Sequence, residues 1–462
     1  MHTLFLTSSF RRSASLVIGL LSLCLSINAQ TGNATKTLTL SQAISIALDQ
    51  NIALQRSALS LESRESNLSQ AKADRNADLN FRVSESFGLS PSDNGGILEG
   101  EGDWNDSTSA SLSSSLSLYS GGAREASIAQ AKAELEAASL DYDYDRQSLL
   151  YNTVSLFLRT ILLSKEITIQ EEELSTRIEE LERININVEN GIRTQAESLR
   201  QQAQVSTSQR SLAQAQNNYA NSLYALKNTL RIPAIAEIVC EDSNLGIASA
   251  ATLSDPDLDQ SLTSLEERVD LNAQKARLTS AEQNLLISKS GNRPSVTASA
   301  SLSTSYSSKQ TNNLSDQFFI DHPRASAGVS VNVPIFDRRR TQLNTTRSHI
   351  SLQQEELQLE ILQRAARTAL YQANHNYHTA KLQLAASNEQ LASTEAALEI
   401  ERSRYEAGAA TLLDVNSLRT SRLDAAIAVE VARSDLFTSR LEVAFQDGTI
   451  ESFLQQTLQS SY

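Results

Sequence analysis

The longest hydrophobic pattern in this chain has a period of seven residues and occurs in two separate stretches. The apolar positions of these stretches are Ile167, Leu174, Leu181 and Val188, and then Leu384, Leu391, Leu398 and Tyr405. Sustained heptad spacing is typical of helices that pack along a narrow coiled-coil seam. The pattern therefore predicts long, thin helices, and the aromatic content of only 5% agrees with a chain that lacks a thick globular core.

One glycine interrupts each helical stretch. Gly191 is the only glycine within residues 123–245, and Gly408 is the only one within residues 329–447. Because glycine accepts the left-handed backbone that ends a helix, we predict two helical hairpins with their tips at these glycines. The first long helix is expected over about residues 124–190. The alternative is an incidental glycine in one continuous helix. It is less well supported because a lone glycine occurs at the same place in both stretches.

The chain repeats its landmarks at a fixed interval. The pairs separated by 217 residues are Gly191 and Gly408, Glu65 and Glu282, Lys72 and Lys289, and Tyr119 and Phe336. A constant offset over four separate landmarks indicates a tandem duplication. We predict a first repeat at 30–240 and a second at 263–457, joined by a linker at 241–262 and followed by a tail at 458–462.

At four places the apolar residues alternate with polar ones, with a period of two residues, instead of following a heptad. In residues 79–84 the apolar Leu79, Phe81 and Val83 alternate with polar residues. The same alternation predicts four strands, at about 79–90, 108–119, 295–306 and 325–336.

Strands with one apolar and one polar face suit a membrane β-barrel with lipid outside and water inside. Two soluble hairpins are the alternative interpretation. Because four strands cannot close a barrel and open edges cannot face lipid, a membrane location would require association with further copies of the chain.

The N-terminus has the layout of an export signal. Arg11 and Arg12 precede an apolar run at residues 16–25, and small and polar residues follow up to Ala29. We therefore predict a signal peptide at residues 1–29. The run is shorter than the ~20 residues that a spanning helix needs. Cys24 lies inside the run, so lipidation is not predicted.

Composition and motifs exclude several functional classes. The formal net charge of −14 makes nucleic acid an improbable partner. Nucleotide-binding loops and the nucleophile elbow of hydrolases do not occur, so no enzyme is predicted. The acidic segment at 141–145 lacks the glycine of a calcium loop, and His375 and His378 lack a third ligand. We therefore predict no metal and no cofactor.

Three motifs together resemble the TolC-like outer membrane efflux family. They are LTLSQAISIALDQN near the start and the paired tips ENGIRTQAESL and EAGAATLLDVNSL. Combined with the duplication, the resemblance covers essentially the whole chain after the signal peptide. It implies a mainly α-helical fold with a membrane β-barrel part, in which three chains contribute four strands each to one twelve-stranded barrel. The coiled-coil hairpins would continue that barrel as an α-barrel.

The resemblance also implies a cellular role. Such a homotrimer sits in outer-membrane lipid, with a large periplasmic portion, and passively conducts cargo for a tripartite efflux or type I secretion system. Its partners would be a periplasmic adaptor protein and an inner-membrane pump of the RND, ABC or MFS type. A secreted periplasmic coiled-coil scaffold without a pore is the alternative function.

The tips are the functional residues that the resemblance identifies first. Gly191 and Ile192 form the first tip, and Gly408 and Ala409 form the second. In this family the hairpin tips dock the adaptor.

A periplasmic gate is the second site that the resemblance implies. Asp414 matches the family's acidic gate position, Glu197 is its counterpart in the first repeat, and Tyr405 matches a tyrosine that ties neighbouring coils. The sequence departs from the family pattern at Ala410, where an arginine is expected, and at Ser417, where a second acid can occur. Arg193, at the place in the first repeat that matches Ala410, is the candidate substitute. The alternative role for both acids is to cap or solvate a helix start.

Overall fold

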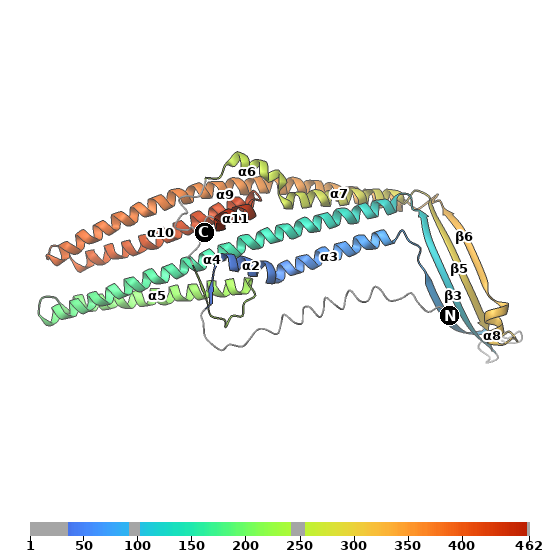
Figure 1. Ribbon diagram of the computed structural model, residues 1–462, viewed down its shortest axis with the longest axis horizontal. Coiled ribbons are helices and arrows are strands. Elements are labelled where there is room, and N and C mark those ends of the chain that lie inside the picture. The colour runs from blue at the N-terminus through green and yellow to red at the C-terminus, as the bar shows by residue number, and fades with distance from the viewer. Residues whose placement is uncertain (1–35, 92–101, 242–254, 460–462) are drawn as a thin grey trace.

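The computed structural model describes residues 36–91, 102–241 and 255–459. The predicted signal peptide, with Cys24, lies outside these residues. The molecule is elongated, with a sheet at one end and the helical hairpin tips at the other (Figure 1). Among the described residues, no helix is long and apolar enough to cross a membrane.

The duplication is visible as pairs of helices of equal length. Helices α4 and α9 have 67 residues each, α5 and α10 have 35 each, and α3 and α7 have 22 each. Every pair is offset by the interval of 217 residues found in the sequence, which confirms the tandem duplication. Their bounds are Ile52–Ala73 (α3), Ala123–Glu189 (α4), Gln195–Thr229 (α5), Val269–Ser290 (α7), Arg340–Glu406 (α9) and Leu412–Gln446 (α10).

Both tips reverse the chain at the predicted glycines. Gly191 has a φ of 71° and Gly408 a φ of 77°, so both adopt the left-handed conformation. The next residue donates its N–H back into the preceding helix, from Ile192 to the Asn187 carbonyl at 2.8 Å and from Ala409 to the Arg404 carbonyl at 2.8 Å. This is the Schellman arrangement that ends a helix. The prediction of hairpins is confirmed, and the continuous-helix alternative is wrong.

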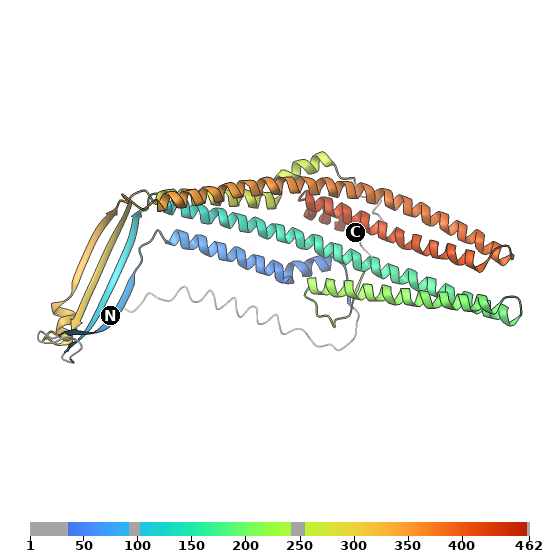
Figure 2. The same cartoon turned by 180° about the vertical axis from the view of Figure 1, so that it is seen from behind.

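The two hairpins lie side by side along the length of the molecule. Figures 1 and 2 show α4 and α5 running next to α9 and α10 toward the same end, while α3 and α7 run back toward the sheet. Helix α4 packs against α3, α5, α7 and α10, so it is the spine that joins the two repeats.

Four antiparallel strands form one sheet in the order β2-β3-β5-β6. The predicted four strands are therefore confirmed, although β3 begins before its predicted start and β6 ends before its predicted end. Pro334 has no N–H to donate to a ladder, which accounts for the early end of β6. The bounds are Asn80–Pro91 (β2), Gly102–Tyr119 (β3), Ser295–Ser307 (β5) and Arg324–Asn332 (β6).

The main hydrophobic core lies midway along the helices. Buried Phe157, Leu226, Phe437 and Leu441 meet there from α4, α5 and α10. Shorter elements that the sequence patterns did not predict surround this core or cap the loops. They are the parallel strands β1 (Lys36–Leu38) and β4 (Ile238–Cys240), and the helices α6 (Leu258–Ser264), α8 (Leu314–Asp316) and α11 (Ile450–Gln459). Helix α2 (Leu40–Gln50) lies within the LTLSQAISIALDQN motif, and Thr39 caps its start.

Replacing Gly408 by alanine tests the role of the left-handed backbone. An added Cβ would meet no atom within 4 Å, so the cost comes from the φ of 77° alone. We expect the Gly408→Ala variant to lose about 1–2 kcal/mol of stability. Thermal unfolding of the detergent-extracted protein, followed by circular dichroism, measures this loss.

Gly328 provides the matched control. A Cβ added there would also meet no atom within 4 Å, but the φ of Gly328 is not in the left-handed region. The Gly328→Ala variant should therefore unfold at the wild-type temperature or slightly above it. Equal losses in both variants would show that the backbone conformation is not the cause.

Candidate functional site

The predicted docking residues lie at the far end of the molecule from the sheet (Figure 1). Ile192 follows the first tip glycine and is 69% exposed. Leu413, in the first turn of α10 next to the second tip, is 70% exposed. The tips therefore present large apolar side chains to the surroundings.

Arg193 and Tyr405 connect the two tips directly. The Arg193 guanidinium carbon lies 4.2 Å from the centroid of the Tyr405 ring, and Arg193 Nη2 donates to the Tyr405 carbonyl oxygen at 3.4 Å. A cation over an aromatic face is attracted by the ring quadrupole. Two residues that the sequence analysis singled out are thus brought together across the two repeats.

Tyr405 also anchors a small apolar cluster beneath this contact. The ring is only 9% exposed and packs with Ile184, Leu412 and Val415. Burial raises the pKa of the Tyr405 hydroxyl above its ordinary value, although the nearby Arg193 acts in the opposite direction. The tyrosine therefore remains neutral at physiological pH, and its ring faces the Arg193 cation.

The two acidic residues occupy equivalent places in the two repeats. Glu197 and Asp414 are the third residues of α5 and α10, and each forms a reciprocal capping box with the threonine before the helix, Thr194 or Thr411. Thr411 Oγ1 donates to the Asp414 carboxylate at 2.6 Å, and these threonine hydrogen bonds lower the pKa of Asp414. Within one chain, both acids therefore cap their helices.

The contact between Arg193 and Tyr405 is called the tie. Only one of the two acids contacts it. Glu197 lies 3.8 Å from Arg193 as an ion pair, whereas the hydrogen bonds of the Asp414 side chain are with Thr411. The structure thus groups Arg193, Glu197 and Tyr405, and leaves Asp414 apart from them.

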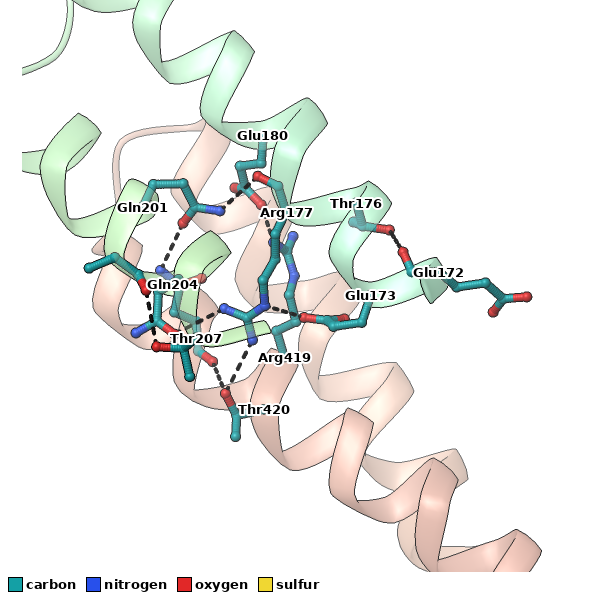
Figure 3. Close-up of polar contacts among 12 residues, drawn as sticks. Glu172, Glu173, Thr176, Arg177, Glu180, Gln201, Gln204, Thr207, Arg419 and Thr420 are labelled. Atoms are coloured by element: carbon teal, nitrogen blue, oxygen red, sulfur yellow. Dashed lines mark hydrogen bonds and ion pairs between the residues drawn. The ribbon is translucent and has the colours of Figure 1, made fainter. Parts of the chain in front are cut away.

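A buried polar cluster lies deeper in the coil (Figure 3). Arg177 on α4 is its centre: Nε donates to Glu173 Oε1 at 2.6 Å, Nη1 donates to Gln204 on α5 at 3.2 Å, and Nη2 donates to Thr420 on α10 at 3.4 Å. Burial raises the pKa of Glu173 despite the neighbouring arginines, which lower it. One side chain thus joins three helices and both hairpins.

Two further contacts of this cluster cross between the hairpins. Arg419 on α10 forms a buried ion pair with Glu180 on α4. Asn416 Nδ2 donates to Gln201 Oε1 at 3.3 Å, and Gln201 Nε2 donates in turn to the Arg177 carbonyl oxygen at 3.2 Å. The cluster therefore contains two arginines and two glutamates, and its formal charges balance.

The sequence analysis did not identify this cluster. Gln170, Glu173, Arg177 and Glu180 follow each other at spacings of three and four, which is the spacing of a coiled-coil seam. The apolar heptad of Ile167, Leu174 and Leu181 lies beside this row and is only half-buried. The spacing of these residues is typical of a buried seam, but their polar side chains indicated a solvent-exposed face.

The other acidic segment considered in the sequence is helical. Residues 141–145 lie within α4, and Asp141 forms an ion pair with Arg277 on α7. Within the parts of the chain that the structure describes, no three or more His, Cys, Asp or Glu residues are grouped to hold a metal ion.

Comparison with known proteins agrees with this architecture. The family model for outer membrane efflux proteins matches residues 43–230 and 262–449, one segment in each repeat. The pyoverdine export outer membrane protein OpmQ of Pseudomonas aeruginosa is 27% identical over 338 residues, which cover 71% of this chain and 68% of OpmQ.

Solved structures show the same fold. The outer membrane protein VceC of Vibrio cholerae is 20% identical, has a TM-score of 0.73, and the match covers 88% of this chain and 96% of VceC. The CmeC outer membrane channel of Campylobacter jejuni is 18% identical, has a TM-score of 0.76, and the match covers 91% of this chain and 89% of CmeC.

The family match extends over both repeats and therefore favours a channel over a secreted scaffold without a pore. Channels of this family work with periplasmic adaptors and inner-membrane pumps and catalyse no reaction. The chain belongs to the outer membrane efflux protein family and is an outer-membrane efflux channel.

Proposed function

We propose that three copies of this chain assemble into one exit duct for a tripartite efflux or type I secretion system. The sheets of the three chains form a twelve-stranded barrel in outer-membrane lipid, and the hairpins form a tunnel across the periplasm. Cargo that an inner-membrane pump of the RND, ABC or MFS type delivers passes through without chemical change.

The unfinished sheet is the observation that carries this proposal. Strands β2 and β6 each pair on one side only, so the described sheet has two open edges. One face exposes large apolar side chains, among them Phe81 and Val83 on β2 and Val329 and Val331 on β6. A threefold assembly pairs every edge and leaves the apolar face for lipid.

The hairpin tips are the proposed docking site for the periplasmic adaptor. Ile192 and Leu413 are exposed next to Gly191 and Gly408, at the end that points away from the sheet. Exposed apolar side chains at the end of a long polar coil suit burial by a partner protein. Ala409 at the second tip is exposed as well.

The same tips contain the proposed gate. Arg193 on the first tip holds Tyr405 on the second, which keeps the two hairpins of one chain together. Threefold symmetry would place three copies of Asp414 and of Glu197 around the narrow end, where acidic side chains attract cations and repel each other. The tie favours the closed arrangement, and repulsion between carboxylates favours opening.

The buried cluster is the proposed brace behind the gate. Its contacts between α4 or α5 and α10 must break if the hairpins separate at that depth. Opening that stops short of Arg177 leaves these contacts intact. The brace therefore limits the separation of the hairpins to the segment between the cluster and the tips.

Removing the tie tests both the duct and its gate. The contact is worth roughly 0.5–2 kcal/mol per chain. In planar bilayers we expect the wild-type trimer to give discrete channels of low conductance, and the Arg193→Ala variant to give channels of higher conductance. Arg200→Ala is the control, because Arg200 is exposed on α5, close to the tip but without a contact to Tyr405.

Unchanged conductance in the Arg193→Ala variant would mean that the tie does not close the duct. A wild-type protein that forms no channel at all would contradict the duct itself.

Docking at the tips can be tested by adding charge to them. In the Ile192→Asp, Leu413→Asp double variant, burial of two carboxylates opposes the contact with the adaptor, so the chain should lose its adaptor while the outer-membrane trimer persists. Affinity purification from cross-linked cells, followed by mass spectrometry, measures the bound adaptor.

Ile235 supplies the control for docking. It is 93% exposed but lies beyond the other end of α5, away from the tips. The Ile235→Asp variant should retain the adaptor. Loss in both variants, or in neither, would argue against docking at the tips.

The brace predicts a characteristic pair of stabilities. Arg177→Leu leaves the buried Glu173 without its partner and should destabilise the protein by about 3–5 kcal/mol. Glu173→Leu combined with Arg177→Leu removes both charges and should recover most of that loss. Thermal unfolding by circular dichroism compares the two variants, and similar midpoints for both would refute the brace.

A further inference from the structure

Hydroxyl groups predominate on the polar face of the two central strands, β3 and β5. Asp103 and Asn105 begin this face of β3, and Thr297 interrupts it on β5; the other alternate residues of the two strands are serines. They are Ser107, Ser109, Ser111, Ser113, Ser115 and Ser117 on β3, and Ser295, Ser299, Ser301, Ser303, Ser305 and Ser307 on β5. The pairing register places the two rows next to each other. In the proposed barrel, on which this inference depends, the face opposite the apolar one lines the lumen.

Two arginines stand out among these hydroxyl groups. The ladder pairs Arg82 with Ser111, Ser111 with Ser303, and Ser303 with Arg324, so both arginines lie on the serine face in one register row. They are the only charged strand residues on this face whose side chains the structure describes. Both side chains are exposed.

Neither arginine has a counter-charge within reach among the strand residues whose side chains the structure describes. Neither forms an ion pair or a side-chain hydrogen bond with another described residue. The strand acids with described side chains, Glu85 and Asp106, alternate onto the opposite face. Asp78, just before β2, accepts hydrogen bonds from Ser115 Oγ at 2.8 Å and Asn80 Nδ2 at 2.9 Å. Asp78 is therefore held at the end of the sheet nearest the helices.

The two arginines share one row of the ladder, but a row is inclined to the barrel axis because barrel strands are tilted, so the two side chains lie at different heights along that axis. Arg82 is the third residue of β2, which enters the sheet from the helices, whereas Arg324 is the first residue of β6, which enters from the loops at the far end (Figure 2). Threefold symmetry turns each into a ring of three cations, with the Arg82 ring nearer the periplasmic end of the barrel and the Arg324 ring farther toward the exit.

We propose that these two rings make the barrel segment of the duct selective for anions, and that the Arg324 ring is a binding site for solutes with several carboxylate or phosphate groups. Fixed charges in a pore concentrate counter-ions, and at 0.1 M salt their field extends over about 10 Å. Guanidinium groups donate paired hydrogen bonds to carboxylate and phosphate oxygens. Serine hydroxyls add hydrogen bonds without a competing charge.

Ion selectivity in planar bilayers tests the proposal. Under a gradient of KCl, we expect the permeability ratio of chloride to potassium to fall by about twofold or more from wild type to the Arg82→Ser, Arg324→Ser variant. Arg82→Lys combined with Arg324→Lys retains the charges and should retain the wild-type ratio. Because the variants are compared with each other, the acids at the periplasmic tip contribute equally to every measurement.

A polyvalent probe locates the site without passing the tips. Inositol hexakisphosphate added on the barrel side should reduce the wild-type current, whereas spermine at equal concentration should not. The Arg324→Ser variant should lose most of this block. If the double serine variant does not assemble, the comparison of the two probes on wild type decides the question.

The outcomes separate this inference from the proposed function. Channels with equal ion selectivity in all variants, or with equal block by both probes, would overturn the arginine rings and leave the duct intact. Wild-type protein that forms no channels would overturn the duct, and the rings with it.

Discussion

Backbone hydrogen bonding at the two edges of a four-stranded sheet constrains this whole protein. The open edges of β2 and β6 expose N–H and C=O groups that lipid cannot satisfy, and the apolar face between them cannot remain in water. The only solution that pairs every group is a closed ring of strands. The chain is thus one segment of the wall of a pore. Its other features follow from its place in the complete assembly.

This constraint explains the unusual composition of the helices. A thin wall around a lumen has two wetted or partner-covered surfaces and little interior, so long stretches of α4 and α9 bury few large side chains. The main core of the described residues lies where α2, α11 and the β1–β4 pair fill the space around the hairpins at mid-length. Between that core and the tips, ion pairs and hydrogen bonds connect the hairpins, as in the cluster around Arg177.

Local rules made much of the architecture predictable from the sequence. Gly191 and Gly408 were informative because a left-handed turn accepts few other residues, and the alternation at Phe81 and Val83 was informative because a pleated strand exposes alternate faces. Once the elements of one repeat were predicted, the offset of 217 residues predicted the positions of the matching elements in the other.

Features that depend on contacts distant in sequence were not predictable in this way. Glu173, Arg177 and Glu180 are polar residues. Their side of α4 is buried only because α10 packs against it. The shared row of Arg82 and Arg324 depends on a register that passes through two intervening strands. The proposed gate role of Asp414 and Glu197 requires neighbouring copies of the chain.

The two repeats share one backbone but have exchanged their side-chain chemistry at the tips. Position 193 is arginine in the first repeat and its match is Ala410, whereas Tyr405 matches Val188. The cation is therefore in the first repeat, and the aromatic ring is in the second. A chain built from two copies of either half would have no tie between its tips. The two halves of the chain therefore carry complementary side chains at the tips, and replacing one half by a copy of the other would remove this contact between the hairpins.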